Sequence, residues 1–316
     1  MNHSKPTTKV LVTDTVHQDL IDGLNQNGYH VEYRPKIPLA EVHSIAHQFV
    51  GMVINSKIIV DRVLLDKALH LKFVARLGSG LEIIDLDYCA QKKVAVIRSP
   101  DGNCDAVAEH AMAMLLSLAI KLRKSDFEVR NKIWNRESNR GWELMNKTVA
   151  ILGFGYTGKA FAKRLSSFGV RILVYDKYLK GFGQSNPHVQ ESTMQAIFKQ
   201  ADVLSLHLPA TSETNGLVDA HFLNQFAKKI TLVNTSRGNI VQLKDLLKAL
   251  DKKQLTGLAL DVFENEKPET YSRDEENDYQ NLFERSNVLL SPHVAGWTVE
   301  SKKRLSKFLL NRIMML

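Results

Sequence analysis

A glycine-rich turn between an apolar strand and a helix constrains the fold of this chain more than any other feature. The segment Gly153-Phe154-Gly155-Tyr156-Thr157-Gly158 follows the apolar run Thr148–Leu152 and opens a helical pattern that stops at Gly169. In such a turn the first glycine permits a tight bend, the second lets the backbone approach a pyrophosphate, and the third lets the helix pack on the strand. The free N–H groups of the helix N-terminus favour phosphate. The turn therefore predicts a βα unit that binds a dinucleotide.

An acidic residue at the end of the next predicted strand indicates which dinucleotide. Asp176 closes the strand pattern Arg171–Asp176, at the position, about 20 residues past the glycines, where a carboxylate contacts the adenosine ribose. A carboxylate there accepts hydrogen bonds from the ribose hydroxyls and repels a 2′-phosphate. We therefore predict NAD as the cofactor, although Lys177 beside it keeps NADP open.

Short β-branched runs alternate with helical patterns along the chain, which predicts parallel sheets flanked by helices. The predicted strands are Lys9–Asp14, Gly51–Ser56, Leu71–Leu77, Val94–Arg98, Thr148–Leu152, Arg171–Asp176, Asp202–Leu208, Thr231–Thr235, Leu255–Val262 and Val288–Leu290. The clearest predicted helices are Val16–Asn27, Asp105–Leu122, Leu243–Leu250 and Thr298–Leu316.

This pattern predicts an α/β protein of two Rossmann-like or flavodoxin-like domains, each with a parallel sheet. A length of 316 residues is enough for two domains. We expect a dinucleotide-binding domain over residues 103–292 and a substrate domain over residues 1–102 plus 293–316. Because the chain then crosses between the domains twice, we expect a cleft between them.

Composition excludes several classes of protein. The only two cysteines, Cys89 and Cys104, form no CxxC pair and have no histidine at metal-ligand spacing, so we expect reduced thiols, no metal and a cytoplasmic location. The first ten residues lack the apolar core of a signal peptide. The apolar run 106–122 carries Glu109 and His110 and is shorter than the ~20 residues that a membrane span needs. We interpret it as a buried helix.

The net charge of +8 is spread along the chain. A protein that binds nucleic acid would concentrate its lysines and arginines in one patch with aromatic residues. We therefore expect no nucleic-acid partner. The basic residues are typical of solvated helix faces, and a basic surface also suits a small anionic substrate.

Three further predicted strands end in titratable or cationic side chains. The segments 234–238, 261–266 and 291–297 supply Arg237, acidic residues and His293. Ligands of open α/β sheets bind beyond the carboxyl ends of the strands, so these groups are expected near the cofactor. Arginine can grip a carboxylate, and a histidine can take a hydroxyl proton as hydride leaves. The set suits the oxidation of a hydroxy acid.

Over nearly its whole length the chain resembles the D-isomer-specific 2-hydroxyacid dehydrogenase family, and especially its D-3-phosphoglycerate dehydrogenase members. The resemblance implies that Arg237 binds the substrate carboxylate and carbonyl, that Glu266 pairs with His293, and that His293 is the acid and base. It implies further substrate contacts from the backbone of Ser79 and Gly80 and from Asn55, Ser56 and Lys57. By the same resemblance, the cofactor is bound by Val107, Gly153, Gly155, Tyr156, Thr157, Gly158, Asp176, His207, Leu208, Pro209, Thr235, Ser236, Asp261 and Gly296.

Some positions depart from the family pattern. Lys267 separates Glu266 from Pro268, which leaves Glu264 open as the partner of His293. The long acidic segment before His293 is expected to be a surface loop. Asn55 stands where many phosphoglycerate-specific members carry arginine, so phosphate would have to be held by Lys57, or by Arg136 or Arg140.

The resemblance implies an NAD-dependent oxidoreductase whose first candidate substrate is D-3-phosphoglycerate, in serine biosynthesis. Reduction of glyoxylate or hydroxypyruvate, or oxidation of D-lactate-type acids, is the alternative. A further alternative is a non-catalytic protein that senses NAD, similar to transcriptional corepressors. Such proteins usually carry long disordered tails. We expect a homodimer with the helix around Ala106–Leu122 at its interface. Because the chain ends at Leu316, we expect no carboxyl-terminal regulatory domain.

Overall fold

The computed structural model describes residues 8–184 and 187–316. The chain divides into two compact units, Met1–Asn103 with Trp297–Leu316, and Cys104–Gly296. The second unit includes residues 293–296, which the sequence analysis assigns to the other domain. Residues 1–7, part of the segment without a signal-peptide pattern, lie outside the described residues.

The first unit is built on a five-stranded, all-parallel sheet with the strand order β2-β1-β3-β4-β5. This is the flavodoxin-like order. Its strands are β1 (Lys9–Val12), β2 (His30–Tyr33), β3 (Gly51–Ile54), β4 (Phe73–Arg76) and β5 (Ala95–Arg98). Its helices are α1 (Gln18–Gln26), α2 (Leu39–Ile45), α3 (Arg62–Lys67), α4 (Leu86–Gln91) and α12 (Val299–Ile313).

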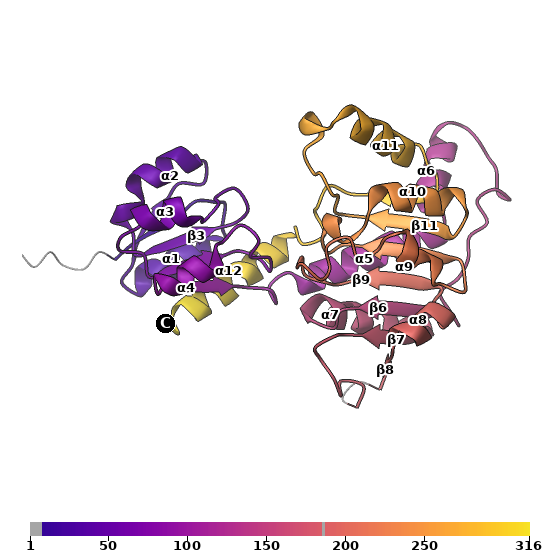
Figure 1. Cartoon of the computed structure of the whole chain (residues 1–316), viewed down its shortest axis with the longest axis horizontal. Coiled ribbons are helices and arrows are strands. Elements are labelled where there is room, and N and C mark those ends of the chain that lie inside the picture. The colour runs from indigo at the N-terminus through magenta and orange to yellow at the C-terminus, as the bar shows by residue number, and fades with distance from the viewer. Residues whose placement is uncertain (1–7, 185–186) are drawn as a thin grey trace, which may run out of the picture. The chain divides into compact units, whose positions relative to one another are not determined.

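Both faces of this sheet are covered, so its strands are apolar on both sides. Val10 and Val12 of β1 belong to the core cluster that includes α1 and α12. Leu11, between them, belongs to the cluster that includes α2, α3 and α4. Figure 1 shows α12, drawn in yellow, lying among the indigo elements of this unit. The last helix of the chain thus completes the core that the first residues begin.

The second unit is built on a seven-stranded, all-parallel sheet with the order β12-β11-β10-β9-β6-β7-β8. Numbered from β6, this is the Rossmann order 3-2-1-4-5-6 with one more strand. The strands are β6 (Thr148–Leu152), β7 (Arg171–Tyr175), β8 (Val189–Glu191), β9 (Val203–Leu206), β10 (Ile230–Asn234), β11 (Leu255–Leu260) and β12 (Val288–Leu290). The order reverses between β6 and β9, which is where such sheets bind their ligands.

Two layers of helices cover this sheet. One core cluster joins it to α5 (Cys104–Ala119) and α7 (Tyr156–Leu165). The other cluster joins it to α8 (Met194–Gln200), α9 (Ala220–Asn224), α10 (Leu243–Asp251) and α11 (Arg273–Phe283). The parallel α/β class predicted from the sequence is confirmed for both units.

The long helix predicted to reach Leu122 ends earlier. The α-helix α5 stops at Ala119, and α6 (Leu122–Arg130) begins after Lys121, whose φ of 53° is left-handed. Trp142 N–H donates to the Ala119 carbonyl at 3.0 Å. A Cβ on Gly141 would lie 2.4 Å from that carbonyl oxygen. The segment that packs on the end of α5 therefore supplies its C-terminal cap.

The prediction of a loop in the acidic segment before His293 is wrong, because this segment forms α11. Ser272 and Glu275 make a capping box, in which each side chain accepts a hydrogen bond from the other's backbone N–H. Three acidic residues in the first turn suit the positive end of the helix dipole. Tyr279 and Leu282 are buried on the side that packs on the unit.

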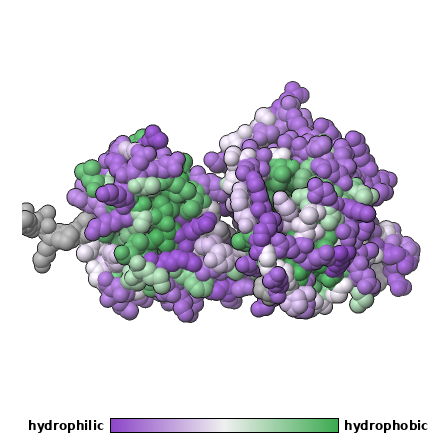
Figure 2. Space-filling model, turned by 60° about the horizontal axis from the view of Figure 1, so that its bottom comes forward, coloured by the Kyte–Doolittle hydropathy of each residue, from purple (hydrophilic) through white to green (hydrophobic). Residues whose placement is uncertain are grey.

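Figure 2 shows hydrophilic side chains over much of the visible surface of each unit, with apolar patches between them. Among the helices that the structure describes, none has the length and apolarity needed to cross a membrane. Within the same residues, no group of three or more His, Cys, Asp or Glu side chains is placed to hold a metal ion.

Candidate active site

Six segments of the second unit that carry predicted site residues follow the carboxyl ends of neighbouring strands. Because the sheet is parallel, these ends share one edge. In strand order the edge carries His293 after β12, Glu266 after β11, Arg237 after β10, His207 after β9, the glycine turn after β6 and Asp176 after β7. With strands about 4.8 Å apart, this row is roughly 24 Å long. That length suits an extended dinucleotide with a small substrate at one end.

The three glycines of the turn meet three different steric demands. Gly153 has a φ of 90°, and a Cβ there would lie 2.3 Å from the carbonyl oxygen of His207. A Cβ on Gly158 would lie 2.1 Å from the carbonyl oxygen of Gly153, so the helix packs directly on the turn. A Cβ on Gly155 would have nothing within 4 Å. The middle glycine therefore faces open space, where the backbone can approach a ligand.

The first turn of α7 offers unsatisfied donors beside that space. Gly155 is the N-cap, followed by Tyr156, Thr157 and Gly158, and Tyr156 is exposed. Among the described residues, none accepts a hydrogen bond from the backbone N–H groups of these four positions. Free N–H groups and the positive end of a ten-residue helix favour a phosphate here.

Asp176 is held in place by the backbone around it. Its Oδ2 accepts from Phe154 N–H at 2.7 Å, and its Oδ1 accepts from the N–H groups of Tyr178 and Leu179, each at 2.9 Å. Burial raises the pKa of Asp176, but these three hydrogen bonds outweigh burial and hold the pKa below its ordinary value. The carboxylate is therefore charged. It keeps about one of its four acceptor positions for a ribose hydroxyl.

His207 is buried and neutral. Its Nε2 lies 2.9 Å from the Ser205 hydroxyl, and its ring lies against Phe161, with the ring centroids 5.1 Å apart. Burial lowers the pKa of His207 to about 3. The next two predicted positions, Leu208 and Pro209, continue the turn, in which the Pro209 carbonyl accepts from Thr214 Oγ1 at 2.6 Å.

The turn after β10 is organised by Asn234. Its Oδ1 accepts from both the N–H and the hydroxyl of Ser236, at 3.0 and 2.7 Å, and its Nδ2 donates to the carbonyl of Arg237 at 2.9 Å. The Thr235 hydroxyl is buried and has no partner among the described residues. A Cβ on Gly238 would lie 1.8 Å from the Phe263 carbonyl oxygen. Gly238 thus lets the arginine turn pack against the loop that carries Glu266.

His293 and Glu266 form the only predicted acid–base pair that these turns bring together. Nδ1 of His293 lies 2.8 Å from Oε2 and 3.0 Å from Oε1 of Glu266. Burial raises the pKa of Glu266, but the hydrogen bond and charge of His293, with smaller effects of Phe263 N–H and Arg237, lower it below its ordinary value. Glu264 instead accepts from Leu243 N–H at 3.0 Å, at the start of α10. Of the two glutamates that the sequence left open, Glu266 is therefore the one that pairs with His293.

Asp261 holds the histidine loop. Its fully buried carboxylate accepts from Ser291 Oγ at 2.6 Å and from the N–H groups of Val294 and Ala295, each at 2.9 Å. Its carbonyl accepts from His293 N–H at 2.7 Å. His293 has a left-handed φ of 55°, which costs a residue with a Cβ roughly 1 kcal/mol. The bonds to Asp261 offset that cost and fix the direction of the imidazole.

Two other predicted cofactor residues lie at the borders of the second unit. Val107 is buried in the first turns of α5, and Gly296 is the last residue of the unit. His110 of the same helix lies 2.8 Å from Ser291 Oγ, through its Nε2. α5 is thereby connected to the loop that carries His293.

The predicted substrate residues of the first unit lie at the carboxyl edge of its own sheet. Asn55 N–H donates to Asp14 Oδ2 at 3.0 Å, Ser56 is exposed, and Lys57 Nζ donates to the carbonyl of Pro35. No described residue accepts a hydrogen bond from the N–H groups of Ser79 and Gly80. This pair of N–H groups is suited to a carboxylate.

Comparison with known proteins decides the family. Residues 112–295 match the family described as D-isomer specific 2-hydroxyacid dehydrogenase, NAD binding domain. This match covers more than half of the chain. The chain belongs to this family. Its second unit is the NAD-binding domain.

Relatives of this chain extend the likeness over both units. It is 32% identical over 294 residues to D-3-phosphoglycerate dehydrogenase of Bacillus subtilis, which covers 93% of this chain and 54% of the relative. It is 30% identical to the D-3-phosphoglycerate dehydrogenase of Archaeoglobus fulgidus, with the same coverage. The chain thus spans about half the length of these curated relatives. A D-lactate dehydrogenase of Aquifex aeolicus, solved with NAD and lactic acid, superposes with a TM-score of 0.83 at 26% identity and covers 96% of this chain and 94% of its own.

The residues present fit NAD. The open space at Gly155, the unused N–H groups of α7 and the partnerless Thr235 hydroxyl all offer contacts that a dinucleotide would complete. Asp176 suits the ribose, as described above. In this chain these groups would hold the pyrophosphate and sugars of the dinucleotide.

Sequence reasoning missed three residues that organise the site. These are Asn234, Ser291 and Ser205, which bond to the arginine turn, to Asp261 and to His207. Each lies in or directly after a predicted strand, one or two positions from a residue that was named. A polar side chain within an otherwise apolar strand is the signal that could have identified them, because burial requires it to find a partner.

Proposed function

We propose that the protein is an NAD-dependent D-2-hydroxyacid dehydrogenase. The observation that carries this is the His293–Glu266 pair, on the same sheet edge as the glycine turn and one strand from the turn of Arg237. An imidazole, a carboxylate and a guanidinium at the nicotinamide end of a dinucleotide site are the groups that hydroxy-acid oxidation needs.

In the proposed reaction, His293 exchanges the proton. Glu266 accepts a hydrogen bond from Nδ1–H, so Nε2 is the basic nitrogen and can accept the proton of the substrate hydroxyl. Bound NAD supplies the acceptor for the C2 hydride. The charge that forms on the imidazole is stabilised by Glu266, whose low pKa keeps it ionised. In the reverse direction the protonated imidazole donates to the carbonyl.

The substrate carboxylate requires cationic or N–H donors. We propose that the guanidinium of Arg237 binds it, because a planar fork can make two parallel hydrogen bonds to a carboxylate or to a carboxylate and a carbonyl. In the first unit, the N–H groups of Ser79 and Gly80, which have no acceptor among the described residues, are suited to an anionic group of a small ligand.

D-3-Phosphoglycerate is the first candidate substrate, and the two curated relatives support it. The enzyme would then act in serine biosynthesis, in the cytoplasm, where its two cysteine thiols stay reduced. The side chains considered for binding a phosphate favour a second candidate, an unphosphorylated acid such as D-lactate, D-glycerate or the reduced form of glyoxylate. Asn55 brings no charge, Lys57 is bonded to a carbonyl, and Arg140 is paired with Glu137.

Initial rates of NADH formation at alkaline pH test the proposal, with D-3-phosphoglycerate, D-lactate, D-glycerate and D-malate compared side by side. The expected result is turnover of at least one acid, with a kcat that His293→Asn lowers by about 10²-fold or more. A preference of orders of magnitude for the phosphorylated acid selects the first candidate, and the opposite preference selects the second. Binding of NADH without turnover of any acid would contradict the proposal that the protein is an enzyme. It would instead favour a protein that senses NAD.

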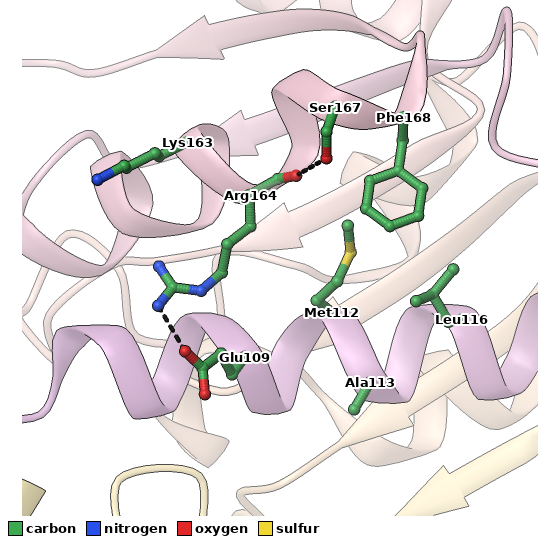
Figure 3. A pocket seen from close by; sticks show the side chains of 8 residues that line it. All are labelled: Glu109, Met112, Ala113, Leu116, Lys163, Arg164, Ser167 and Phe168. Carbon is green, nitrogen blue, oxygen red and sulfur yellow. Dashed lines mark hydrogen bonds and ion pairs between the residues drawn. The ribbon is translucent and has the colours of Figure 1, made fainter. Parts of the chain in front are cut away.

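We also propose that the protein forms a homodimer through α5, α6 and the segment that follows them. Large apolar side chains there are exposed, with Trp134 80% and Phe127 64% exposed. A cavity of about 440 Å³ also opens between α5 and α7, where Arg164 reaches across to Glu109 (Figure 3). Its lining residues are Glu109, Met112, Ala113, Leu116, Lys163, Arg164, Ser167 and Phe168. An apolar surface of this kind is typical of a protein interface.

Sedimentation velocity at micromolar concentration tests the dimer. We expect the wild type to sediment as a dimer and Phe127→Glu to sediment as a monomer. Leu69→Glu alters an equally exposed apolar residue of the first unit and should leave the dimer intact. A monomeric wild type, or a Phe127→Glu dimer, would contradict the proposal.

A further inference from the structure

A bridge of three side chains joins the loops after β7 and β9, on either side of the glycine turn. Lys177 Nζ lies 2.7 Å from Glu213 Oε2. The hydroxyl of Tyr178 donates to the same oxygen at 2.7 Å. The Lys177 ammonium also lies 5.6 Å from the centre of the Tyr178 ring. We refer to Lys177, Tyr178 and Glu213 as the loop bridge.

The loop bridge stands where the adenosine half of a dinucleotide would bind. β6 lies between β9 and β7 in the sheet, so loops after β9 and β7 flank the turn that follows β6. Lys177 and Tyr178 come directly after Asp176, whose carboxylate faces that turn through its bond from Phe154 N–H. A group added to the 2′ position of the ribose would lie close to Asp176 and to the two side chains that follow it.

The charges around the adenosine ribose determine whether a 2′-hydroxyl or a 2′-phosphate is favoured there. Asp176 is ionised and repels a phosphate. Lys177 would attract one, but its charge is neutralised by Glu213 at contact distance. Lys180, the other nearby cation, donates to the carbonyl of Asp176 at 3.0 Å. A 2′-phosphate, which carries nearly two negative charges, would therefore have to compete with Glu213 for Lys177.

We propose that Glu213 is a specificity-determining residue for the coenzyme, because it holds Lys177 and Tyr178 across the two loops and keeps the Lys177 ammonium from binding a 2′-phosphate. Asp176 repels the phosphate directly, and Glu213 withholds the cation that could offset this repulsion. The inference rests on the NAD site and does not depend on which hydroxy acid is the substrate.

Binding of reduced coenzymes, measured by nicotinamide fluorescence without substrate, tests this role. In Glu213→Gln, we expect NADPH to bind about three- to tenfold more tightly than in the wild type, with NADH affinity within about twofold. The gain should shrink as salt is raised, because it arises between exposed charges. The double variant Lys177→Met/Glu213→Gln should return NADPH affinity to the wild-type value.

Two controls separate this effect from simpler ones. Glu284→Gln makes the same change in net charge at an exposed position on the C-cap of α11 and should leave both affinities unchanged. Lys180→Met in the Glu213→Gln background should keep most of the gain. An equal change in NADH and NADPH affinity, no change in either, or a gain that survives Lys177→Met would overturn the proposal. Because catalysis is not measured, failure of the proposed reaction would leave this result intact.

Discussion

The ligand-facing loops of the two units differ in how firmly the protein holds them. In the second unit, Asp261, Asn234 and Asp176 each bind two or more backbone or hydroxyl donors, and Gly153 and Gly158 pack against carbonyl oxygens. In the first unit, Ser56 and Lys57 are exposed and the N–H groups of Ser79 and Gly80 have no partner among the described residues. The residues proposed for the cofactor and for proton transfer are thus held firmly by the fold, whereas the residues proposed for the substrate in the first unit are held by fewer bonds.

The largest effect is expected at the proton-transfer group of the rigid edge. His293→Asn should lower kcat about 10²- to 10⁴-fold, because general acid–base catalysis contributes that much. Asparagine tolerates the left-handed backbone that His293 adopts, so the loop should keep its shape. Steady-state rates with the preferred acid give kcat, and nicotinamide fluorescence should show unchanged NADH affinity. A kcat within tenfold of wild type would remove His293 from the reaction.

The glycine turn allows stability and coenzyme binding to be separated. Gly158→Ala should lower the free energy of unfolding by about 1–3 kcal/mol, because its Cβ would overlap the Gly153 carbonyl. Gly155→Ala should unfold like the wild type, because its Cβ meets nothing in the protein, yet bind NADH more weakly. Urea unfolding without coenzyme and NADH titration measure the two effects. Equal losses of stability in both variants would show that the space at Gly155 is filled.

The buried His207 predicts how stability depends on pH. Its pKa is about 3 in the folded protein and ~6.5 in the unfolded chain. Between these values the unfolded state binds the extra proton, so stability is complete above pH ~6.5 and falls by about 1.4 kcal/mol per unit as pH drops. In His207→Asn this part of the slope should vanish. Urea midpoints at pH 7, 6 and 5 measure it, and an unchanged slope would mean that other groups dominate.

The rigid elements were also the ones that sequence patterns located. The βα turn and the strands β6 and β12 follow from apolar runs and from residues at strand ends, whereas the pairing of Glu266 with His293 was implied by the family resemblance. The short strand β2 has exposed ends, and β8 has three residues, so neither gave an apolar run. α11 was missed because its apolar positions are few, and its cap at Ser272 was not recognised.

Contacts between distant residues could not be predicted in the same way. The bond of Asp261 to the Ser291–Ala295 loop and the bridge of Lys177 to Glu213 join segments that only the strand order brings together. The choice between Glu264 and Glu266 as the partner of His293 depends in the same way on a distant residue. The Glu264 carboxylate accepts a hydrogen bond from Leu243 N–H, at the start of α10. Local sequence patterns predict which residues lie at the strand ends. The order of the strands in the sheet determines which distant residues these contact.

The smallest effect is expected on the loosely held side, at Lys57. If its ammonium contacts a substrate phosphate, Lys57→Met should lower kcat/KM for D-3-phosphoglycerate roughly two- to fivefold, within the usual range for an exposed ion pair. The value for D-glycerate, which lacks the phosphate, should not change. Asn55→Arg should shift the ratio of these two values toward the phosphorylated acid. An equal loss with both acids would mean that Lys57 serves only to bind the Pro35 carbonyl, and that selection of the substrate lies elsewhere in the first unit.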